Sequence, residues 1–355
     1  HFLDDKQLPA VKPSDGYYAT RAFAQYAIDF LAEHKEKHGS EPFFLYLAFI
    51  APHFPLHALP EDIARYRDRY LEGWDSIREA RWRRLRALGI VDCGLSPLDP
   101  GFTPRYLKPD LIDMIGPGEV EHALAWSELT PQQQRLQATK MAIHAAMVDR
   151  MDQEIGRVLD QLRKMGAWDN TLVVFLSDNG ADATLIVRGD GHDRAADPGS
   201  AASFLCLGPG WASVSNAPFR RHKIWVHEGG ISTPCIMHWP AAIRSKGALR
   251  HTPAHVIDLV PTVLELADVA APGPGLVRNI IAEARLMFPN TLLNLGCMRP
   301  GGAYRGALDV MAIDAGVNLI VQPASEALEH ARALGLAIVE TDECCAFLGG
   351  AGASA

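Results

Sequence analysis

The sequence predicts an α/β fold in which short apolar strands form a mixed or parallel sheet flanked by helices. Two runs, residues 43–50 and 171–176, are almost wholly apolar and have the length of buried strands. Two longer segments, residues 18–38 and 132–165, carry apolar residues at the spacing of amphipathic helices. In open α/β sheets ligands collect just beyond the carboxyl ends of the strands, so the residues that follow the two runs are candidates for a site.

The composition is that of a globular protein without a nucleic-acid or membrane signal. The chain has 355 residues, of which 48% are hydrophobic and 21% charged, which suffices for one large α/β domain or two smaller ones. The formal net charge is −8 and no concentrated basic stripe is present, so nucleic acid is not an expected partner. No apolar run reaches the ~18 residues that span a bilayer.

The longer predicted helix has clear signals at both ends. Thr130 is a favoured N-cap residue, and Pro131 is favoured at the first helical position. Gly166 is typical of the residue that follows a helix. We expect the acidic residues of this helix to lie on its solvent-exposed face, namely Asp149, Asp152 and Glu154.

Shorter elements fill the rest of the first 270 residues. Residues 60–91 carry Arg and Glu at helical spacing and predict one or two charged helices, docked on the body of the protein by Trp74 and Trp82. Residues 93–118 are rich in Pro and Gly and predict an irregular loop. We also expect strands at residues 204–207 and 234–239 and a helix at residues 258–268.

The cysteines give no sign of a metal or redox site. The chain contains six of them, with neither a C-x-x-C pair nor a zinc-binding spacing. Cys344 and Cys345 are adjacent and cannot easily form a relaxed disulfide with each other. We therefore expect structural thiols, and the redox compartment stays open.

A pair of oxygen donors follows the apolar run 171–176. Asp178 and Asn179, in the sequence S-D-N-G, supply a carboxylate and an amide oxygen, which are hard donors suited to Ca²⁺ or Mg²⁺. The same residue types are common in ordinary turns, so the four residues alone leave both interpretations open.

Two basic residues strengthen the interpretation as a binding site. Lys223 stands five residues before Glu228 and the double glycine that follows it, where its amine is available to an anion. His53 lies between two prolines after the run 43–50, on a backbone that both prolines stiffen. His57 either lines the same pocket or lies on the surface.

Five motifs together give a resemblance to a known family. They are S-D-N-G, the loop R-G-D-G-H-D, L-C-L-G-P-G-W, K-x-x-x-x-E-G-G and A-P-H-x-P. From about residue 15 to residue 270 the chain resembles sulfatases of the arylsulfatase type, within the alkaline-phosphatase-like superfamily. The resemblance implies a partial sulfatase catalytic domain over residues 1–270.

The resemblance also implies roles for individual residues. Asp178 and Asn179 are expected to bind Ca²⁺ or Mg²⁺, and Lys223 to bind the sulfate oxygens. His53 is expected to contact the sulfate group or the leaving oxygen, and His227 is a secondary substrate-binding candidate. The implied substrate is a small-molecule or carbohydrate sulfate ester. The compartment stays open, because such enzymes are often periplasmic, secreted or lysosomal.

Some residues of the family's site have no counterpart here. The motif C/S-x-P-x-R, which supplies the formylglycine nucleophile of the family, is absent from the chain. In the family a pair of aspartates follows a buried strand and precedes the nucleophile motif. Asp4-Asp5 has neither beside it and is expected to be an exposed loop. We therefore expect a fragment that lacks its N-terminal part, with little or no turnover of its own. The alternatives are a non-catalytic module that binds a metal or an anion, or a phosphodiesterase or phosphatase of the same superfamily.

The loop R-G-D-G-H-D gathers three further candidates for chemistry. Asp190, His192 and Asp193 lie close together on a glycine-rich segment. Residues so closely spaced are more typical of turns than of a metal site, so we expect a loop that lines the pocket.

The chain changes character after the Ala-, Pro- and Gly-rich residues 270–275. Residues 271–355 predict a β-α-β-α-β segment, with strands at 292–297, 318–323 and 336–341 and helices at 307–315 and 325–334. The sequences L-G-C-M-R-P-G-G and D-E-C-C resemble the end of a radical-SAM, biotin-synthase-like protein. The cysteine triplet that holds the iron–sulfur cluster of such proteins is absent, so no such cofactor is implied. We expect a fused remnant or an accessory lobe.

Overall fold

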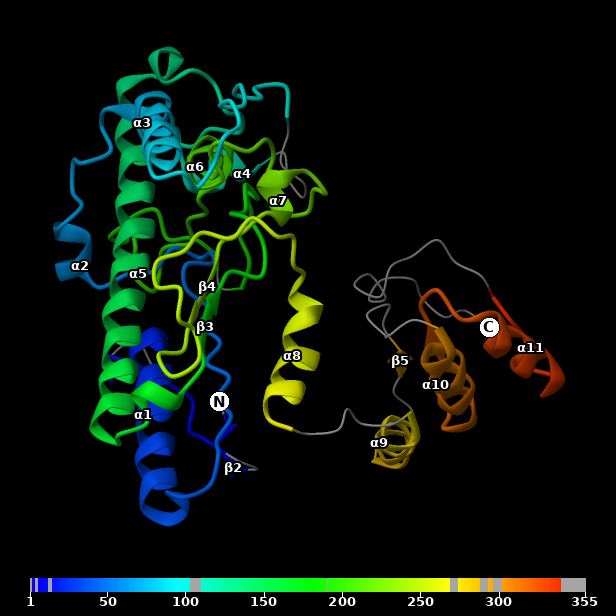
Figure 1. Ribbon diagram of the computed structural model, residues 1–355. Helices are drawn as coiled ribbons and strands as arrows, with labels where there is room; N and C mark the ends of the chain where they lie inside the picture. The colour runs from blue at the N-terminus through cyan, green and yellow to red at the C-terminus, as the bar shows by residue number, and fades with distance from the viewer. Residues whose placement is uncertain are drawn as a thin grey trace. The chain divides into compact units, whose positions relative to one another are not determined.

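The computed structural model describes residues 2–3, 6–11, 15–102, 110–189, 191–268, 274–287, 293–295 and 302–339. By its internal contacts the chain divides into two compact units, His1–Arg250 and His251–Ala355. Figure 1 shows the elements of both. The boundary predicted at residue 270 lies some way beyond this division and stays a prediction.

The first unit is built on one long helix. Helix α5 (Pro131–Lys164) begins and ends within one residue of the predicted bounds. The Thr130 hydroxyl accepts a hydrogen bond from the backbone N–H of Gln133 at 3.3 Å, and the Gln133 side chain accepts one from the backbone N–H of Thr130 at 2.8 Å. This reciprocal pair satisfies two of the donors that a helix start leaves without partners. Gly166 follows the helix with a φ of 73°, as predicted.

The cap of α5 gives a stability test. Replacing Thr130 by Ala is expected to lower the free energy of unfolding by about 1 kcal/mol, because a helix donor then loses its acceptor. The matched control is Thr139→Ala in the interior of the same helix, where the hydroxyl bonds the Arg135 carbonyl and Ala has the higher helix propensity. Urea unfolding of both variants checks this, and equal destabilisation by the two would contradict it.

Helix α1 (Ala19–His38) confirms the predicted helix over residues 18–38 and packs against α5, as Figure 1 shows. Their shared core contains Ala24 and Leu31 of α1 and Leu162 of α5. Burial of these apolar side chains is the main favourable contribution of the contact.

The expected exposed acidic face of α5 is wrong for one residue. Asp152 is exposed, but Glu154 is only 2% exposed. Its carboxylate pairs with Arg157 at 2.5 Å and Arg150 at 3.7 Å. Burial of this carboxylate is tolerated because these two guanidinium groups and that of Arg21, at 4.0 Å, replace the water that it loses.

The predicted buried strand over residues 43–50 is also wrong. These residues are extended but pair with no strand in the described chain, and they alternate between half-buried and exposed. Phe43 and Leu47 pack on the core beneath α1 and α5, whereas Phe44 and Tyr46 are 75% and 81% exposed. Because side chains of an extended segment point alternately to opposite faces, only one apolar face of this run is covered.

The central strand is present but differs from the predicted buried parallel strand. Strand β3 (Val173–Leu176) pairs antiparallel with β4 (Cys235–His238), with Val173 opposite His238 and Leu176 opposite Cys235. Strand β4 confirms the strand predicted at residues 234–239. Three of the four residues of β3 are half-buried, whereas all four residues of β4 are exposed, so this two-stranded sheet is not a buried one.

Short elements complete the first unit. The predicted charged helices are α2 (Pro60–Ala64) and α3 (Gly73–Ala87). Residues 204–207, predicted as a strand, are instead a largely buried extended segment without a ladder. The others are β1 (Phe2–Leu3), β2 (Lys6–Gln7), α4 (Leu111–Ile115), α6 (Gly208–Ser215), α7 (Glu228–Ile231) and the 3₁₀ helices η2 (Trp126–Glu128) and η3 (Trp168–Asn170).

Three tryptophan rings hold α3 and α6 together. Trp74 of α3 lies edge-on to Trp126 at 4.8 Å and to Trp211 of α6 at 5.5 Å between ring centroids. Each indole N–H that is buried here donates to a carbonyl, Trp74 to Leu124 and Trp211 to Gln137. The predicted docking role of Trp74 is therefore confirmed.

The described cysteines include both buried and exposed thiols. Cys206 is fully buried, and this burial raises the pKa of its thiol to about 12. Cys93 and Cys235 are free and exposed. The other three cysteines lie outside the described residues.

The second unit contains two short strands, four α-helices and one 3₁₀ helix in its described part. They are η4 (Val256–Asp258), α8 (Leu259–Leu266), α9 (Pro274–Met287), β5 (Asn294–Leu295), α10 (Gly302–Asp314), β6 (Leu319–Ile320) and α11 (Ser325–Ala333). Helix α8 confirms the predicted helix at 258–268. Strands β5 and β6 pair in parallel, and α10 contacts α9 and α11. Residues 336–339 form no strand, so the predicted β-α-β-α-β order is not confirmed.

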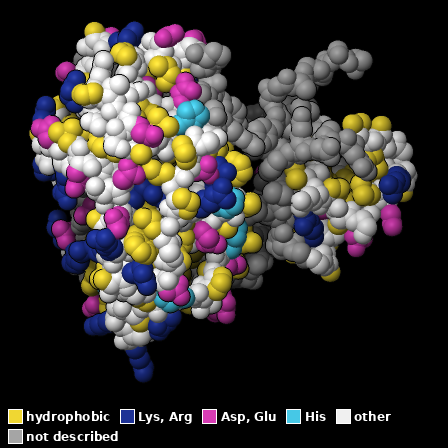
Figure 2. Space-filling model, turned by 90° about the horizontal axis from the view of Figure 1, so that it is seen from above, with side chains coloured by type: hydrophobic (Ala, Val, Ile, Leu, Met, Phe, Trp, Pro, Cys, Tyr) yellow, Lys and Arg dark blue, Asp and Glu magenta, His cyan; other side chains and the backbone are white. Residues whose placement is uncertain are grey.

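The described part of the chain contains no candidate transmembrane helix, and the face shown in Figure 2 has no basic stripe. Among the described residues, no helix has both the length and the apolar character needed to cross a bilayer. Figure 2 shows positive and negative side chains interspersed over one face of the molecule. This mixture agrees with the net charge of −8.

Candidate functional site

The turn S-D-N-G follows β3 directly, as predicted. The Ser177 hydroxyl donates to the carbonyl of Asn179 at 2.8 Å, and the Thr233 hydroxyl donates to the carbonyl of Ser177 at 2.8 Å. These bonds close the turn and fix it to the segment before β4. Asp178 is exposed, and its carboxylate makes no ion pair with any described residue.

The double glycine of E-G-G packs against this turn. The backbone N–H of Gly180 donates to the carbonyl of Gly230 at 2.9 Å. A Cβ atom at Gly180 would overlap the carbonyl of Gly229, and one at Gly230 would overlap the carbonyl of Trp225. Gly180 is therefore required for the close approach of the turn to the E-G-G backbone, and Gly230 for the tight fold of its own segment.

Lys223 is joined to the same turn. Its backbone N–H donates to the carbonyl of Ala181 at 3.1 Å. Asp178 and Ala181 are three residues apart, so their Cα atoms are separated by at most about 11 Å. The Lys223 side chain is half-buried, and its ammonium has no ion pair in the part of the chain that the structure describes. The structure thus joins the segment that carries Lys223 to the turn that carries Asp178 and Asn179, although the two lie far apart in the sequence.

A buried asparagine holds the two segments in register. Asn216 accepts a hydrogen bond from the backbone N–H of Ala181 at 2.7 Å. Its amide donates to the carbonyls of Ala181 at 3.1 Å and Arg221 at 3.2 Å. One side chain therefore connects the turn that carries Asn179 with the segment that carries Lys223. No sequence motif singled out this residue.

The three candidate histidines are not joined to this turn by the described hydrogen bonds. His53 is exposed, and its Nδ1 donates to the carbonyl of Phe54 at 2.6 Å. His57 is half-buried, and its Nε2 donates to the carbonyl of Ser203 at 2.8 Å. His227 is exposed at the start of α7. Within the described residues no hydrogen bond joins His53 or His227 to Lys223 or Asp178.

The described part of the loop R-G-D-G-H-D makes local contacts, and its predicted place in the lining of the site stays a prediction. His192 accepts a hydrogen bond at Nδ1 from the backbone N–H of Phe204 at 2.9 Å, and burial lowers its pKa. The Asp193 carboxylate accepts one from the backbone N–H of Ala195 at 2.8 Å. Asp190 and the pair Asp4-Asp5 lie outside the described residues.

The donors at the turn fit part of a hard-cation site. The Asp178 carboxylate is unpaired as described above, and the Asn179 amide donates to the carbonyl of Gly180 at 3.0 Å, which leaves its Oδ1 without a described partner. Ca²⁺ takes 6–8 oxygen ligands, so these two residues supply only some of them. No group of three or more His, Cys, Asp or Glu side chains suited to a metal occurs among the described residues.

Comparison with known proteins decides the family. A sulfatase family model matches residues 2–269. The chain belongs to the sulfatase family. It is 35% identical over 272 residues to an uncharacterized sulfatase of Schizosaccharomyces pombe, an alignment that covers 74% of this chain and 45% of the relative. It is 33% identical over 264 residues to an arylsulfatase of Klebsiella aerogenes, which covers 72% of this chain and 52% of that enzyme.

The match to this family is partial in length. The chain spans about half the length of these two relatives. A solved structure described as Ps i-CgsB in complex with k-i-k-neocarrahexaose aligns with a TM-score of 0.40 and 24% identity, over 72% of this chain and 35% of that one. The predicted resemblance to sulfatases is confirmed, whereas the predicted likeness of residues 271–355 to a radical-SAM protein stays a prediction.

Proposed function

We propose that this protein acts on sulfate esters, and that the turn 177–180 and Lys223 form part of the site. The observation that carries this proposal is the hydrogen bond from the backbone of Lys223 to Ala181, which joins the cationic segment to the turn with the two oxygen donors. The membership of the sulfatase family and the likeness to an arylsulfatase support it.

Each residue then has a distinct task. Asp178 and Asn179 hold a divalent cation, Ca²⁺ or Mg²⁺, which when bound supplies positive charge where negative charge develops on the reacting group. The Lys223 ammonium binds sulfate oxygens, since it is a compact cation without a described partner. His53 contacts the sulfate group or the leaving oxygen, and His227 is a further substrate contact. The substrate is a small-molecule or carbohydrate sulfate ester.

The cation site can be tested by calorimetric titration with Ca²⁺. Replacing Asp178 by Asn is expected to weaken binding of Ca²⁺ by about tenfold or more, because the site loses its charged donor. Asp152→Asn, an exposed carboxylate on α5, is the matched control and is expected to leave the affinity unchanged. Identical Ca²⁺ affinities in the wild type and Asp178→Asn would contradict the assignment.

The role of Lys223 calls for a separate titration with two esters in the presence of Ca²⁺. Lys223→Ala is expected to weaken binding of 4-nitrophenyl sulfate by about tenfold or more, because a charge-assisted contact is lost. The affinity for Ca²⁺ should stay the same. If 4-nitrophenyl phosphate binds more tightly than the sulfate in a Lys223-dependent way, phosphatase chemistry replaces the proposed function.

A further inference from the structure

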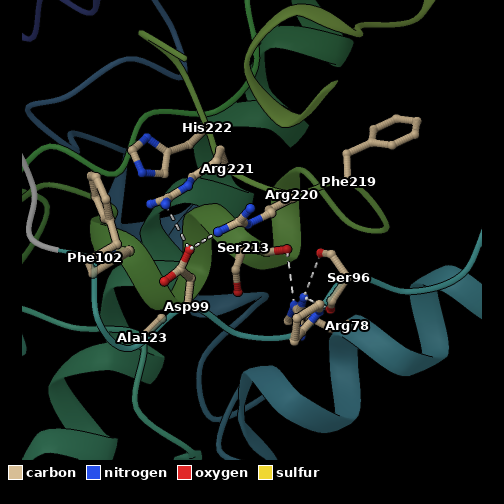
Figure 3. A pocket seen from close by; sticks show the side chains of 12 residues that line it. Arg78, Ser96, Asp99, Phe102, Ala123, Ser213, Phe219, Arg220, Arg221 and His222 are labelled. Atoms are coloured by element: carbon tan, nitrogen blue, oxygen red, sulfur yellow. Dashed lines mark hydrogen bonds and ion pairs between the residues drawn. The ribbon is translucent and has the colours of Figure 1, made fainter. Parts of the chain in front are cut away.

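A second basic site lies beside the Lys223 segment. A pocket of about 30 Å³ opens between α3, the loop that contains Ser96 and Asp99, α6 and the residues just before Lys223. Figure 3 shows the guanidinium groups of Arg78 and Arg221 and the ring of His222 on its walls. This volume exceeds the ~10–15 Å³ that one water molecule requires, so a small ligand can enter.

Arg78 places a buried charge without an ion pair in the wall of the pocket. It is only 4% exposed, and its guanidinium donates to neutral oxygens, the carbonyls of Ser96 at 2.8 Å and Ser213 at 3.3 Å. No carboxylate lies within ion-pair distance of it among the described residues. Burial of this cation costs free energy and lowers the pKa of Arg78, and the charge of the Asp75 carboxylate offsets this effect only in part.

The opposite wall has more positive than negative charge. Arg220 and Arg221 share a single oxygen, Oδ2 of Asp99, at 3.2 Å each. The Nε–H of Arg221 is buried and has no hydrogen-bond partner. With Arg78, the lining therefore contains three guanidinium groups and one carboxylate.

His222 adds an unsatisfied nitrogen to this wall. The ring is 7% exposed, and its Nδ1 donates to the carbonyl of Lys223 at 3.1 Å. Its Nε2 is buried without a partner, and burial lowers the pKa of the ring. A proton taken up from solvent on anion binding would give Nε2 a hydrogen to donate.

We propose that this pocket binds a small oxyanion of the sulfate or phosphate type, held by Arg78, Arg221 and His222. A tetrahedral anion satisfies the Nε–H of Arg221 and offsets the charge of Arg78 at the same time. Because His222 precedes Lys223 and bonds its carbonyl, the bound anion also fixes the segment that presents Lys223. Binding of an anion in this pocket does not require that the proposed sulfate-ester function holds.

The test is calorimetric titration of the protein with inorganic sulfate, inorganic phosphate and acetate at low ionic strength. We expect sulfate or phosphate to bind and acetate to bind more weakly, because a carboxylate has fewer acceptor oxygens. Arg221→Gln is expected to weaken sulfate binding by about tenfold. Asp99→Asn is expected to strengthen it severalfold, because the only carboxylate in the described lining is removed. A gain of affinity cannot arise from misfolding.

Two controls separate this site from the sulfate-ester site. Arg163→Gln on the exposed surface of α5 should leave sulfate binding unchanged. Lys223→Ala should leave the Arg221-dependent part of sulfate binding unchanged, whereas it weakens 4-nitrophenyl sulfate binding if the proposed function holds. The inference is overturned if the wild type binds neither sulfate nor phosphate, if Asp99→Asn and Arg221→Gln match the wild type, or if Lys223→Ala alone abolishes sulfate binding.

Discussion

Replacing Lys140 by Met is expected to lower the free energy of unfolding by about 3–5 kcal/mol, the usual effect of breaking a buried ion pair on one side. Lys140 and Glu119 are both fully buried at their side chains, and the ammonium lies 2.6 Å from Oε1 of the carboxylate. The same oxygen accepts hydrogen bonds from the Gln137 amide and from the backbone N–H of Val120, each at 2.9 Å. Without the lysine, the Glu119 charge stays buried and loses its cation.

The double variant Lys140→Met/Glu119→Gln provides the control. It removes both charges and keeps an acceptor for Gln137, so most of the lost stability should return. Urea unfolding of the wild type, Lys140→Met and the double variant gives the three free energies. If the single and double variants are equally unstable, the loss comes from packing and not from the unpaired charge.

Replacing Asn216 by Ala is expected to lower the free energy of unfolding by about 2–3 kcal/mol, because three hydrogen bonds of largely buried groups are lost. The larger consequence concerns the site. Without the asparagine, Ala181 and Arg221 are no longer held together, so the segment with Lys223 is free to move relative to Asp178. We therefore expect weaker binding of both Ca²⁺ and 4-nitrophenyl sulfate.

A conservative variant distinguishes a role of Asn216 in positioning the Lys223 segment from a role in the stability of the whole protein. Asn216→Asp keeps the acceptor for the Ala181 N–H but replaces the two amide donations by repulsion between a carboxylate and two carbonyls. Asn170→Ala serves as the matched control, because its amide oxygen accepts only an exposed bond from Trp239 at 3.3 Å at the other end of β3. Ligand affinities of Asn216→Ala equal to those of Asn170→Ala would show that Asn216 has a structural role alone.

The helices could be predicted because their signals are local. The N-cap at Thr130, the glycine at 166 and the apolar stripes specify α1 and α5 without reference to the rest of the chain. The sheet could not be predicted in the same way. An apolar run indicates a strand, but its partner, direction and coverage depend on segments far away in the sequence, such as the pairing of β3 with β4.

The candidate site was partly accessible from the sequence. Asp178, Asn179 and Lys223 have chemically distinctive residue types beside turns, and the structure places them on adjoining segments. Asn216 and His222 contribute through hydrogen bonds or an unsatisfied nitrogen, which no local pattern reveals. Lys140 could have been noticed in the sequence, because it follows Gln137 by three residues within the apolar stripe of α5. A charged side chain at such a position requires a buried partner.

The extended segment 43–50 has a consequence for the behaviour of the protein at high concentration. Its backbone groups from Phe43 to Phe49 bond no other described backbone, and its outer side presents Phe44 and Tyr46 to water. A strand of another molecule can pair with such an edge through backbone hydrogen bonds and apolar contacts. Self-association through strand pairing between molecules is therefore expected to increase with protein concentration. The substitution Tyr46→Lys is expected to suppress it.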